Sequence, residues 1–382
     1  MNLRTIGVGV ALSFTIAIYL AQTFGWRQGA LLMVGVGAGL ALYHAAFGFT
    51  SAWRNVVTSG RGAGLRAQLL MLAVTTLVFL PLLSGGQLWG TELSGNVRPL
   101  NVSVLVGAFL FGIGMQLGGG CASGTLFTAG GGSIRMIVTL AAFIVGSALG
   151  AFHRPSWEEA PGYGPISLMA EFGFFGALAM TLALLTSIWA GSTLIERRRH
   201  GSVQGLGGGM SGRAWLQGPW PLAAGAMGLV LVNIATLVLA GRPWGITSGF
   251  ALWGSKIAAA LGVDVAAWPY WQSATAAATL ESSVFGDITS VMNFGIVLGA
   301  LMAAGLAGRF ALVWRVPARS LIAAIIGGVL LGYGARIAYG CNIGAYFSGV
   351  SSTSVHGWAW FVAAFVGSAF GTRLRPVFGL AN

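Results

Sequence analysis

The two cysteines are the residues of this sequence with the most distinctive chemistry. Cys121 lies in Gly120-Cys121-Ala122-Ser123-Gly124, and Cys341 lies in Gly340-Cys341-Asn342-Ile343-Gly344. A thiol is soft and polarizable and donates a weak S–H hydrogen bond. Neither cysteine belongs to a Cys-x-x-Cys pair and the four histidines are scattered, so we expect no metal and no cofactor. The sequence has no Ser/His/Asp set, phosphate loop or paired carboxylates, which argues against an enzyme such as a hydrolase or ATPase.

Both cysteines occupy equivalent positions in an internal repeat. Residues 112–124 align with residues 332–344 at an offset of 220, the separation of Cys121 and Cys341. Residues 145–150 match residues 366–371 after a slip of one, and Gly48-Phe49-Thr50-Ser51 matches Gly245-Ile246-Thr247-Ser248. Three matches in the same order indicate that the chain consists of two related halves.

Each copy of the cysteine motif predicts an apolar helix, a glycine-rich break and a short helix that begins at the cysteine. Glycine permits the close packing and backbone angles that such a break requires. The free N–H groups and positive dipole end of a helix N-terminus favour an anion. A neutral thiol would let an anion pass more easily than a thiolate, so we expect the neutral form. The predicted substrate-binding residues are Cys121, Cys341, Gly120, Ala122, Ser123, Gly124, Gly340, Asn342, Ile343, Gly344, Arg336 and Gln116.

Three alternatives remain open for these residues. Each cysteine on its own is compatible with a small buried hydrophobe, the usual role of a free cysteine. A disulfide is possible if both thiols face one throat, although it would obstruct a path. Arg336 takes the position of Gln116 in the other copy, and it either attracts an anion or extends to the membrane interface.

The elements that must position these residues are membrane helices. Hydrophobic residues make up 56% of the 382 residues and charged residues only 7%, too few to coat a water-soluble globule. The net charge of +12 comes from arginines scattered at the ends of apolar runs and one lysine, Lys256. This distribution suits anchoring at anionic lipid, and we expect no nucleic acid partner. We therefore predict an all-α polytopic membrane protein with an uncleaved first helix over residues 6–24.

Further apolar segments are predicted near residues 31–49, 68–83, 102–117, 134–152, 167–190, 221–240, 246–263, 288–306, 321–331 and 358–370. Several are too short to cross about 30 Å of hydrocarbon, which indicates re-entrant or discontinuous helices. Residues 191–218 form a basic Gly/Ser-rich connector, which the positive-inside rule places in the cytoplasm with residues 309–319 and 373–375. The stretches 153–165 and 264–286 then lie on the opposite side.

This sidedness divides the chain and orients its two halves. We predict an N-terminal transmembrane helix over 1–29, a first half over 30–190, the cytoplasmic connector over 191–218 and a second half over 219–382. Leu100 then enters its helix from outside and its equivalent Ser320 enters from inside, so the halves are expected to be inverted repeats. Such repeats place a solute site at the midplane between them.

The sequence resembles the YeeE/YedE family of inner-membrane sulphur transport proteins. The likeness extends roughly over residues 34–374 and rests on residues 332–346, 120–124, 245–248 and Ser354-Val355-His356-Gly357-Trp358. It implies an hourglass of about nine long helices and several short helices, in the inner membrane of a bacterium. It also implies that Cys121 and Cys341 lie along a narrow path and pass thiosulfate by transient S–H contacts.

The resemblance includes one departure and suggests one partner. Thiosulfate-transporting members have a further cysteine in a Phe-Cys-Phe-like stretch, and Gly48 stands there between Phe47 and Phe49. Family members often work with a small cytoplasmic sulfur carrier of the TusA type, for which the arginines of residues 197–213 are a candidate docking surface.

The sequence therefore predicts a permease for thiosulfate or a similar small sulfur anion in contact with membrane lipid. The alternatives are a transporter of a selenium compound, a membrane redox enzyme that uses the two thiols as a couple, and a purely structural subunit.

Overall fold

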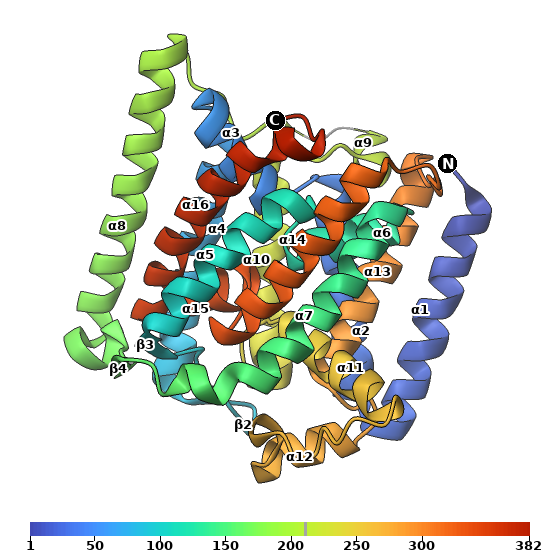
Figure 1. Ribbon diagram of the computed structural model, residues 1–382. Helices are drawn as coiled ribbons and strands as arrows, with labels where there is room; N and C mark the ends of the chain where they lie inside the picture. The colour runs from blue at the N-terminus through green and yellow to red at the C-terminus, as the bar shows by residue number, and fades with distance from the viewer. Residues whose placement is uncertain (210–211) are drawn as a thin grey trace.

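The computed structural model describes residues 1–209 and 212–382 and is largely helical (Figure 1). Residues 210 and 211 of the predicted connector lie outside the described residues. The helices of the first part are α1 Leu3–Phe24, α2 Trp26–His44, α3 Phe49–Ser59, α4 Ala63–Gly85, α5 Val102–Gly118, α6 Ala122–Gly130, α7 Ile134–Glu158 and α8 Leu168–His200. Those of the second part are α9 Ala214–Gln217, α10 Leu222–Ala240, α11 Thr247–Ala260, α12 Ala274–Glu281, α13 Ile288–Ala307, α14 Ala318–Ile337, α15 Gly349–Ser351 and α16 Val355–Leu374.

Short elements complete the structure. They are the 3₁₀ turns η1 Pro269–Trp271 and η3 Arg375–Phe378, and the π-helix η2 Asn342–Ser348. Strands β1 Gln87–Leu88 and β2 Thr91–Glu92 form one antiparallel ribbon, and β3 Pro99–Asn101 and β4 Gly162–Pro165 form another. The predicted all-α class is confirmed, since these strands are minor additions at the ends of helices.

Nine helical stretches in the described part of the chain are long and apolar enough to cross a membrane. The two with the least buried apolar windows are α1 and α8, at 22% each, which is expected of helices with a broad face toward lipid. The polytopic membrane class is confirmed, as is the prediction of about nine long helices. The hourglass shape and the proposed domain division stay predictions.

The long apolar stretches are broken where the sequence permits unusual backbone angles. Helix α2 ends at His44 and α3 begins at Phe49, with Ala46 in the left-handed region at φ 45° between them. Helix α5 ends at Gly119 with φ 91°, and the turn after α14 contains Tyr339 with φ 60° and Gly340 with φ 153°. Such breaks occur within membrane proteins only where other protein segments or a cavity receive the freed backbone groups.

Glycines let the core helices approach one another closely. A Cβ on Gly112 of α5 would clash with the backbone of α16 at Ala364, and a Cβ on the equivalent Gly332 of α14 would clash with α7 at Phe143. Helices α5 and α14 also touch each other, with Gly107 against Gly334 and Gly114 close to Gly327. At the offset of 220, Gly107 corresponds to Gly327 and Gly114 to Gly334. The Gly107–Gly334 contact therefore becomes the Gly327–Gly114 contact when the two helices are exchanged, so we call these contacts partner-swapped.

The connectors gather at two opposite ends of the molecule. Figure 1 shows the chain termini, α9 and the end of α8 at one end, and the β-ribbons and α12 at the other. The first end carries the arginine-rich connectors that the sequence places in the cytoplasm. The second carries residues 153–165 and 264–286. Helix α8 extends to His200, so residues 191–200 of the predicted connector are helical.

Candidate functional site

Both cysteines are helix N-caps in the protein interior. Cys121 precedes α6 and Cys341 precedes η2, which continues directly into α15. Each cysteine is 1% exposed, both lie in the same hydrophobic cluster, and α6 packs against η2. Both thiols are free. The predicted placement of the cysteines at helix starts is confirmed, and the two short helices that they begin are neighbours.

The backbone around the two cysteines is built in the same way. A Cβ on Gly120 would lie 3.1 Å from Thr125 N, and a Cβ on Gly340 would lie 2.8 Å from Ala345 N. The carbonyl of each cysteine accepts a 2.8 Å hydrogen bond from the N–H of Thr125 or Ala345. A larger residue before either cysteine would therefore push the following turn away. Gly124 and Gly344 occupy the next turn of each helix, and Cys121 Sγ lies 3.3 Å from Ser123 Oγ.

The environment of Cys341 contains buried polar groups without partners. The carboxamide oxygen and nitrogen of Asn342 and the hydroxyl of Tyr346 have no hydrogen-bond partner among the described residues, and both side chains are fully buried. Buried polar atoms in native proteins nearly always have a partner, so each exception needs an explanation. These atoms therefore have unused hydrogen-bonding capacity in the helical element that Cys341 begins. Ile343 and Ala122 supply apolar surface next to the cysteines, at 0% exposure.

Two other helix starts meet the element that follows Cys341. Gly344 lies next to Gly245, and Ser348 Oγ donates a 2.7 Å hydrogen bond to the carbonyl of Trp244. The ring of Phe49, at the start of α3, makes an edge contact with Tyr346 at 6.4 Å between centroids. Gly48 is the N-cap of α3. The repeated segments 48–51 and 245–248 are therefore both placed close to the region of Cys341.

Gln116 is occupied by internal hydrogen bonds. Its Nε2 donates to Ser368 Oγ at 2.7 Å and to the carbonyl of Thr50 at 3.0 Å, and its Oε1 accepts from Arg54 at 3.4 Å. Arg375 Nη1 donates to the Gln116 carbonyl at 2.7 Å. Arg135 donates to the carbonyls of Leu117 and Gly118 at 2.6 and 2.7 Å. Arginines thus satisfy the carbonyls at the end of α5, where the helix breaks before Cys121.

Arg336 has a different environment from its counterpart Gln116. It is 7% exposed, and its Nε and Nη1 have no hydrogen-bond partner within residues 1–209 and 212–382. It lines a cavity of about 960 Å³ at the end of the molecule that carries residues 153–165 and 264–286. We call this cavity, together with the adjoining one of about 490 Å³, the arginine vestibule; it is lined by Arg98, Arg154, Arg242, Arg336, Tyr270 and Tyr339. Whether Arg336 attracts an anion or extends to the membrane interface stays a prediction.

The sequence analysis did not identify Arg98, Arg154 and Arg242. They come from segments far apart in the chain, so no local motif unites them. One signal was present: Arg154-Pro155 follows the repeated segment 145–150, as Arg375-Pro376 follows 366–371.

Comparison with known proteins agrees with this arrangement. A family profile described as sulphur transport matches residues 44–370. The chain belongs to the sulphur transport family. This span contains both cysteine elements, both copies of the repeat and the arginine vestibule, and it confirms the YeeE/YedE resemblance.

Individual members of the sulphur transport family differ in how much of the chain they match. The probable transporter YedE of Escherichia coli is 32% identical over 167 residues, which cover 43% of this chain and 41% of that protein. The chain thus matches about two fifths of the length of that relative. The thiosulfate transporter TsuA of Spirochaeta thermophila is 28% identical over 352 residues, covering 86% of this chain and 92% of that protein. The thiosulfate transporter TsuA of Escherichia coli is 23% identical and covers 88% and 91%.

Proposed function

We propose that this protein is a permease that takes up thiosulfate or a similar small sulfur anion past Cys121 and Cys341. The observation that carries the proposal is that the two cysteines cap two short helices that pack together in the interior. Family membership and the thiosulfate transporters among the relatives support the substrate class. The proposed location is a bacterial inner membrane.

The two halves are proposed to be inverted repeats. The partner-swapped contacts between α5 and α14 support this, because a two-fold relation requires that every contact occur twice with its partners exchanged. The packing of α5 on α16 and of α14 on α7 is a second such pair. An inverted pair brings the two cysteines from opposite sides toward one constriction near the midplane.

Within this constriction the protein offers soft and polar contacts without a full charge. The thiols can donate S–H bonds to the solute, the Asn342 carboxamide can donate or accept, and the N–H groups at the start of α6 favour an anion. Contacts of this strength allow release as well as binding, which conduction requires. A cytoplasmic carrier of the TusA type stays a prediction of the family resemblance.

The test is uptake of radiolabelled thiosulfate by cells that lack other routes for it. Cys121→Ala and Cys341→Ala should each reduce uptake at least tenfold, whereas Cys121→Ser and Cys341→Ser should retain part of it because a hydroxyl still donates. Ser147→Ala in α7 is the control, since it removes a buried hydroxyl that has no hydrogen-bond partner among the described residues and lies outside the predicted binding residues. The amount of folded protein is measured by size-exclusion chromatography of each variant. Full uptake by both alanine variants would refute the role of the thiols.

Selenium compounds and sulfite serve as competing substrates in the same cells. Preferential uptake of a selenium compound over thiosulfate would reassign the substrate, in keeping with Gly48 at the position of the further family cysteine. Cycling of the two thiols between a dithiol and a disulfide during turnover would instead favour the redox enzyme.

A further inference from the structure

We propose that Asn342 and Tyr346, which we call the Asn–Tyr pair, form a subsite that donates hydrogen bonds to the oxygens of a sulfur oxyanion and orients it at Cys341. The inference rests on the proposed function, which brings the solute to this cysteine. It divides the recognition of one solute between two kinds of group. The thiols contact its soft sulfur, and the amide and the hydroxyl contact its oxygens.

The Asn–Tyr pair carries unused hydrogen-bonding groups in the protein interior. Both side chains are 0% exposed, and Asn342 Oδ1, Asn342 Nδ2 and the Tyr346 hydroxyl have no hydrogen-bond partner in the part of the chain that the structure describes. Each such group costs stability because it has given up its bonds to water. An anion with several acceptor oxygens would satisfy the N–H groups and the O–H group together.

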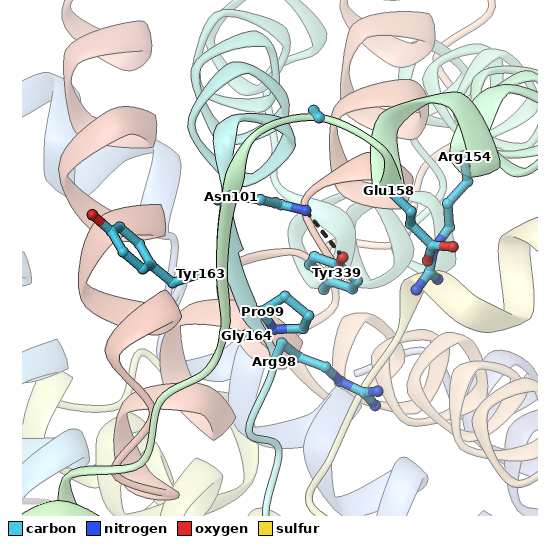
Figure 2. A pocket seen from close by; sticks show the side chains of 10 residues that line it. Arg98, Pro99, Asn101, Arg154, Glu158, Tyr163, Gly164 and Tyr339 are labelled. Carbon is cyan, nitrogen blue, oxygen red and sulfur yellow. Dashed lines mark hydrogen bonds and ion pairs between the residues drawn. The ribbon is translucent and has the colours of Figure 1, made fainter.

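Other polar side chains around Cys341 have partners. Ser348, in the same element, donates from Oγ to the carbonyl of Trp244 at 2.7 Å. Figure 2 shows Tyr339, two residues before Cys341, whose hydroxyl accepts a 3.4 Å bond from Asn101 Nδ2. These surroundings therefore do satisfy a hydroxyl of either kind, while the Asn–Tyr pair is left without a partner.

The equivalent positions of the first half are apolar. At the offset of 220, Asn342 corresponds to Ala122 and Tyr346 to Leu126, and both of these residues are 0% exposed. The repeat therefore packs without polar groups at these two positions. In the second half the same positions carry a desolvation cost, which contact with a solute would offset.

The winding of the Cys341 element brings the Asn–Tyr pair onto one face. Element η2 is a π-helix, in which the Cys341 carbonyl accepts a 2.8 Å bond from Ala345 N and a 3.4 Å bond from Tyr346 N. Asn342 and Tyr346 are four residues apart, a spacing that places side chains on the same face of a helix. Turns of π-helix are frequent at functional sites. The pair thus follows the thiol directly and shares one face of the element that the thiol begins.

The Tyr346 ring is held by aromatic neighbours from both halves. It stacks on Phe361 of α16, with ring centroids 4.7 Å apart and 13° between the planes. It also makes edge contacts with Phe49 and Trp53 of α3, at 6.4 and 6.1 Å between centroids. Trp53 Nε1 donates to Gln68 at 2.9 Å and is therefore already engaged. A ring fixed in this way loses little entropy when its hydroxyl binds a solute.

The test is the unfolding midpoint of the purified full chain in detergent, measured with increasing sodium thiosulfate against sodium chloride of equal ionic strength. A solute that binds the folded state raises the midpoint, and the dependence on concentration gives the dissociation constant. Tyr346→Phe keeps the stacked ring and removes only the hydroxyl, and Asn342→Leu replaces the carboxamide by an apolar group of similar size. Each should weaken thiosulfate binding about tenfold, as expected for the loss of one charge-assisted hydrogen bond.

The midpoints without solute separate binding from packing. Neither variant removes a hydrogen bond within the described part of the chain, so each should unfold at the midpoint of the parent or above it. Ser348→Ala is the matched control in the same element. It removes the bond to the Trp244 carbonyl, so it should lower the midpoint and keep the dissociation constant within about threefold of the parent. Unchanged binding in Tyr346→Phe, or an equal loss of binding in Ser348→Ala, would overturn the subsite even if Asn342→Leu does not fold.

Selenosulfate identifies the end of the solute that the Asn–Tyr pair contacts, because it differs from thiosulfate only in its terminal atom. Both variants should weaken the two anions by the same factor, and a loss confined to thiosulfate would contradict the assignment to oxygens. The midpoint does not depend on transport, so it separates this inference from the proposed function. Binding that depends on the pair in a protein that imports no sulfur anion would retain the subsite and reject the permease. Normal uptake by Tyr346→Phe together with unchanged binding would retain the permease and reject the subsite.

Discussion

Arg135 offers a quantitative test of how the break before Cys121 is held in place. Its guanidinium donates to the carbonyls of Leu117 and Gly118 and to Ser320 Oγ at 2.8 Å. Thr139 also donates to the Gly118 carbonyl, at 3.2 Å, whereas Arg135 is the one side-chain donor to Leu117 O among the described residues. Arg135→Met therefore removes three bonds and leaves a buried carbonyl at the end of a helix without its donor.

The expected cost follows from these contacts. An unsatisfied buried carbonyl costs about 1–3 kcal/mol and each of the other two bonds contributes about 1 kcal/mol, so local opening becomes easier by at least about 3 kcal/mol, the lower end of this sum. At about 1.4 kcal/mol per decade, the open population rises about 100-fold. The rise should be visible at Cys121, because local opening exposes the segment that follows Gly118.

A thiol-labelling assay measures this opening directly. With only two cysteines in the chain, Cys341→Ala leaves Cys121 as the single reporter. In that background, a membrane-permeant maleimide should label Cys121 about 100-fold faster after Arg135→Met. Arg197→Met is the control, since Arg197 is exposed at the same end of the molecule and should leave the rate unchanged. Labelling of the folded Arg135→Met protein within threefold of its parent would refute the assignment of Arg135 as the clamp on this break.

Two further predictions concern stability, and both are measured as the unfolding midpoint in detergent. Glu196 is fully buried and bonded to Arg66 at 2.7 Å. Glu196→Gln should therefore lower the free energy of unfolding by about 3–5 kcal/mol, because it leaves the buried charge of Arg66 unpaired. The double variant R66M/E196L should recover part of that loss, and an equal loss in both variants would contradict the pairing. A Cβ on Gly334 would lie 2.8 Å from Phe111 N, so Gly334→Ala should cost about 1–3 kcal/mol through overpacking. Gly37→Ala, with nothing within 4 Å of its Cβ, should be neutral or stabilising, and similar midpoints for the two alanine variants would count against the close packing of α5 and α14.

The sequence was informative where composition and spacing determine structure. The cysteine motifs correctly predicted helix starts because glycines interrupt the preceding helix and a new run of residues that can form a helix begins after each cysteine. An aspartate directly before an apolar run is typical of an N-cap, and the Asp287 side chain accepts from Ser290 N at the start of α13. The glycine repeat also pointed to the close helix contacts.

Helix limits were less predictable because hydropathy measures composition and not backbone conformation. The apolar run 31–49 reads as one helix, but the chain breaks between His44 and Phe49, where Ala46 takes a left-handed conformation. Conversely, the predicted segment 321–331 ends too early. The backbone of α14 continues to Ile337 through Arg336, whose charge is accommodated by a cavity.

Long-range polar contacts were beyond the sequence. The run that begins at Glu196 reads as a solvated charge cluster, yet Glu196 is buried and accepts bonds from Arg61, Arg66 and the N–H of Gly62. The arginine vestibule is similar, since it forms only when α7, α14 and the connectors that carry Arg98, Arg242 and Tyr270 meet. Charge repulsion among its arginines gives no sequence signal, because its cost depends on distances that only the fold fixes.

The two Arg-Pro pairs follow equivalent repeat segments but differ in their surroundings. Arg154 and Arg375 occupy equivalent positions, and inverted halves would place one at each mouth of a path. The Arg375 guanidinium donates a hydrogen bond to the carbonyl of Gln116, whereas Arg154 lines a cavity with Tyr270 and Arg336. Gln116 and Arg336 are a second pair of equivalent repeat positions. Gln116 is hydrogen-bonded internally, while Nε and Nη1 of Arg336 have no partner among the described residues. Arg154 is itself paired with Glu158 at 2.7 Å, so the second difference is the one that leaves an unpaired positive charge at the vestibule. In the permease that we propose, this charge attracts the anion to that mouth.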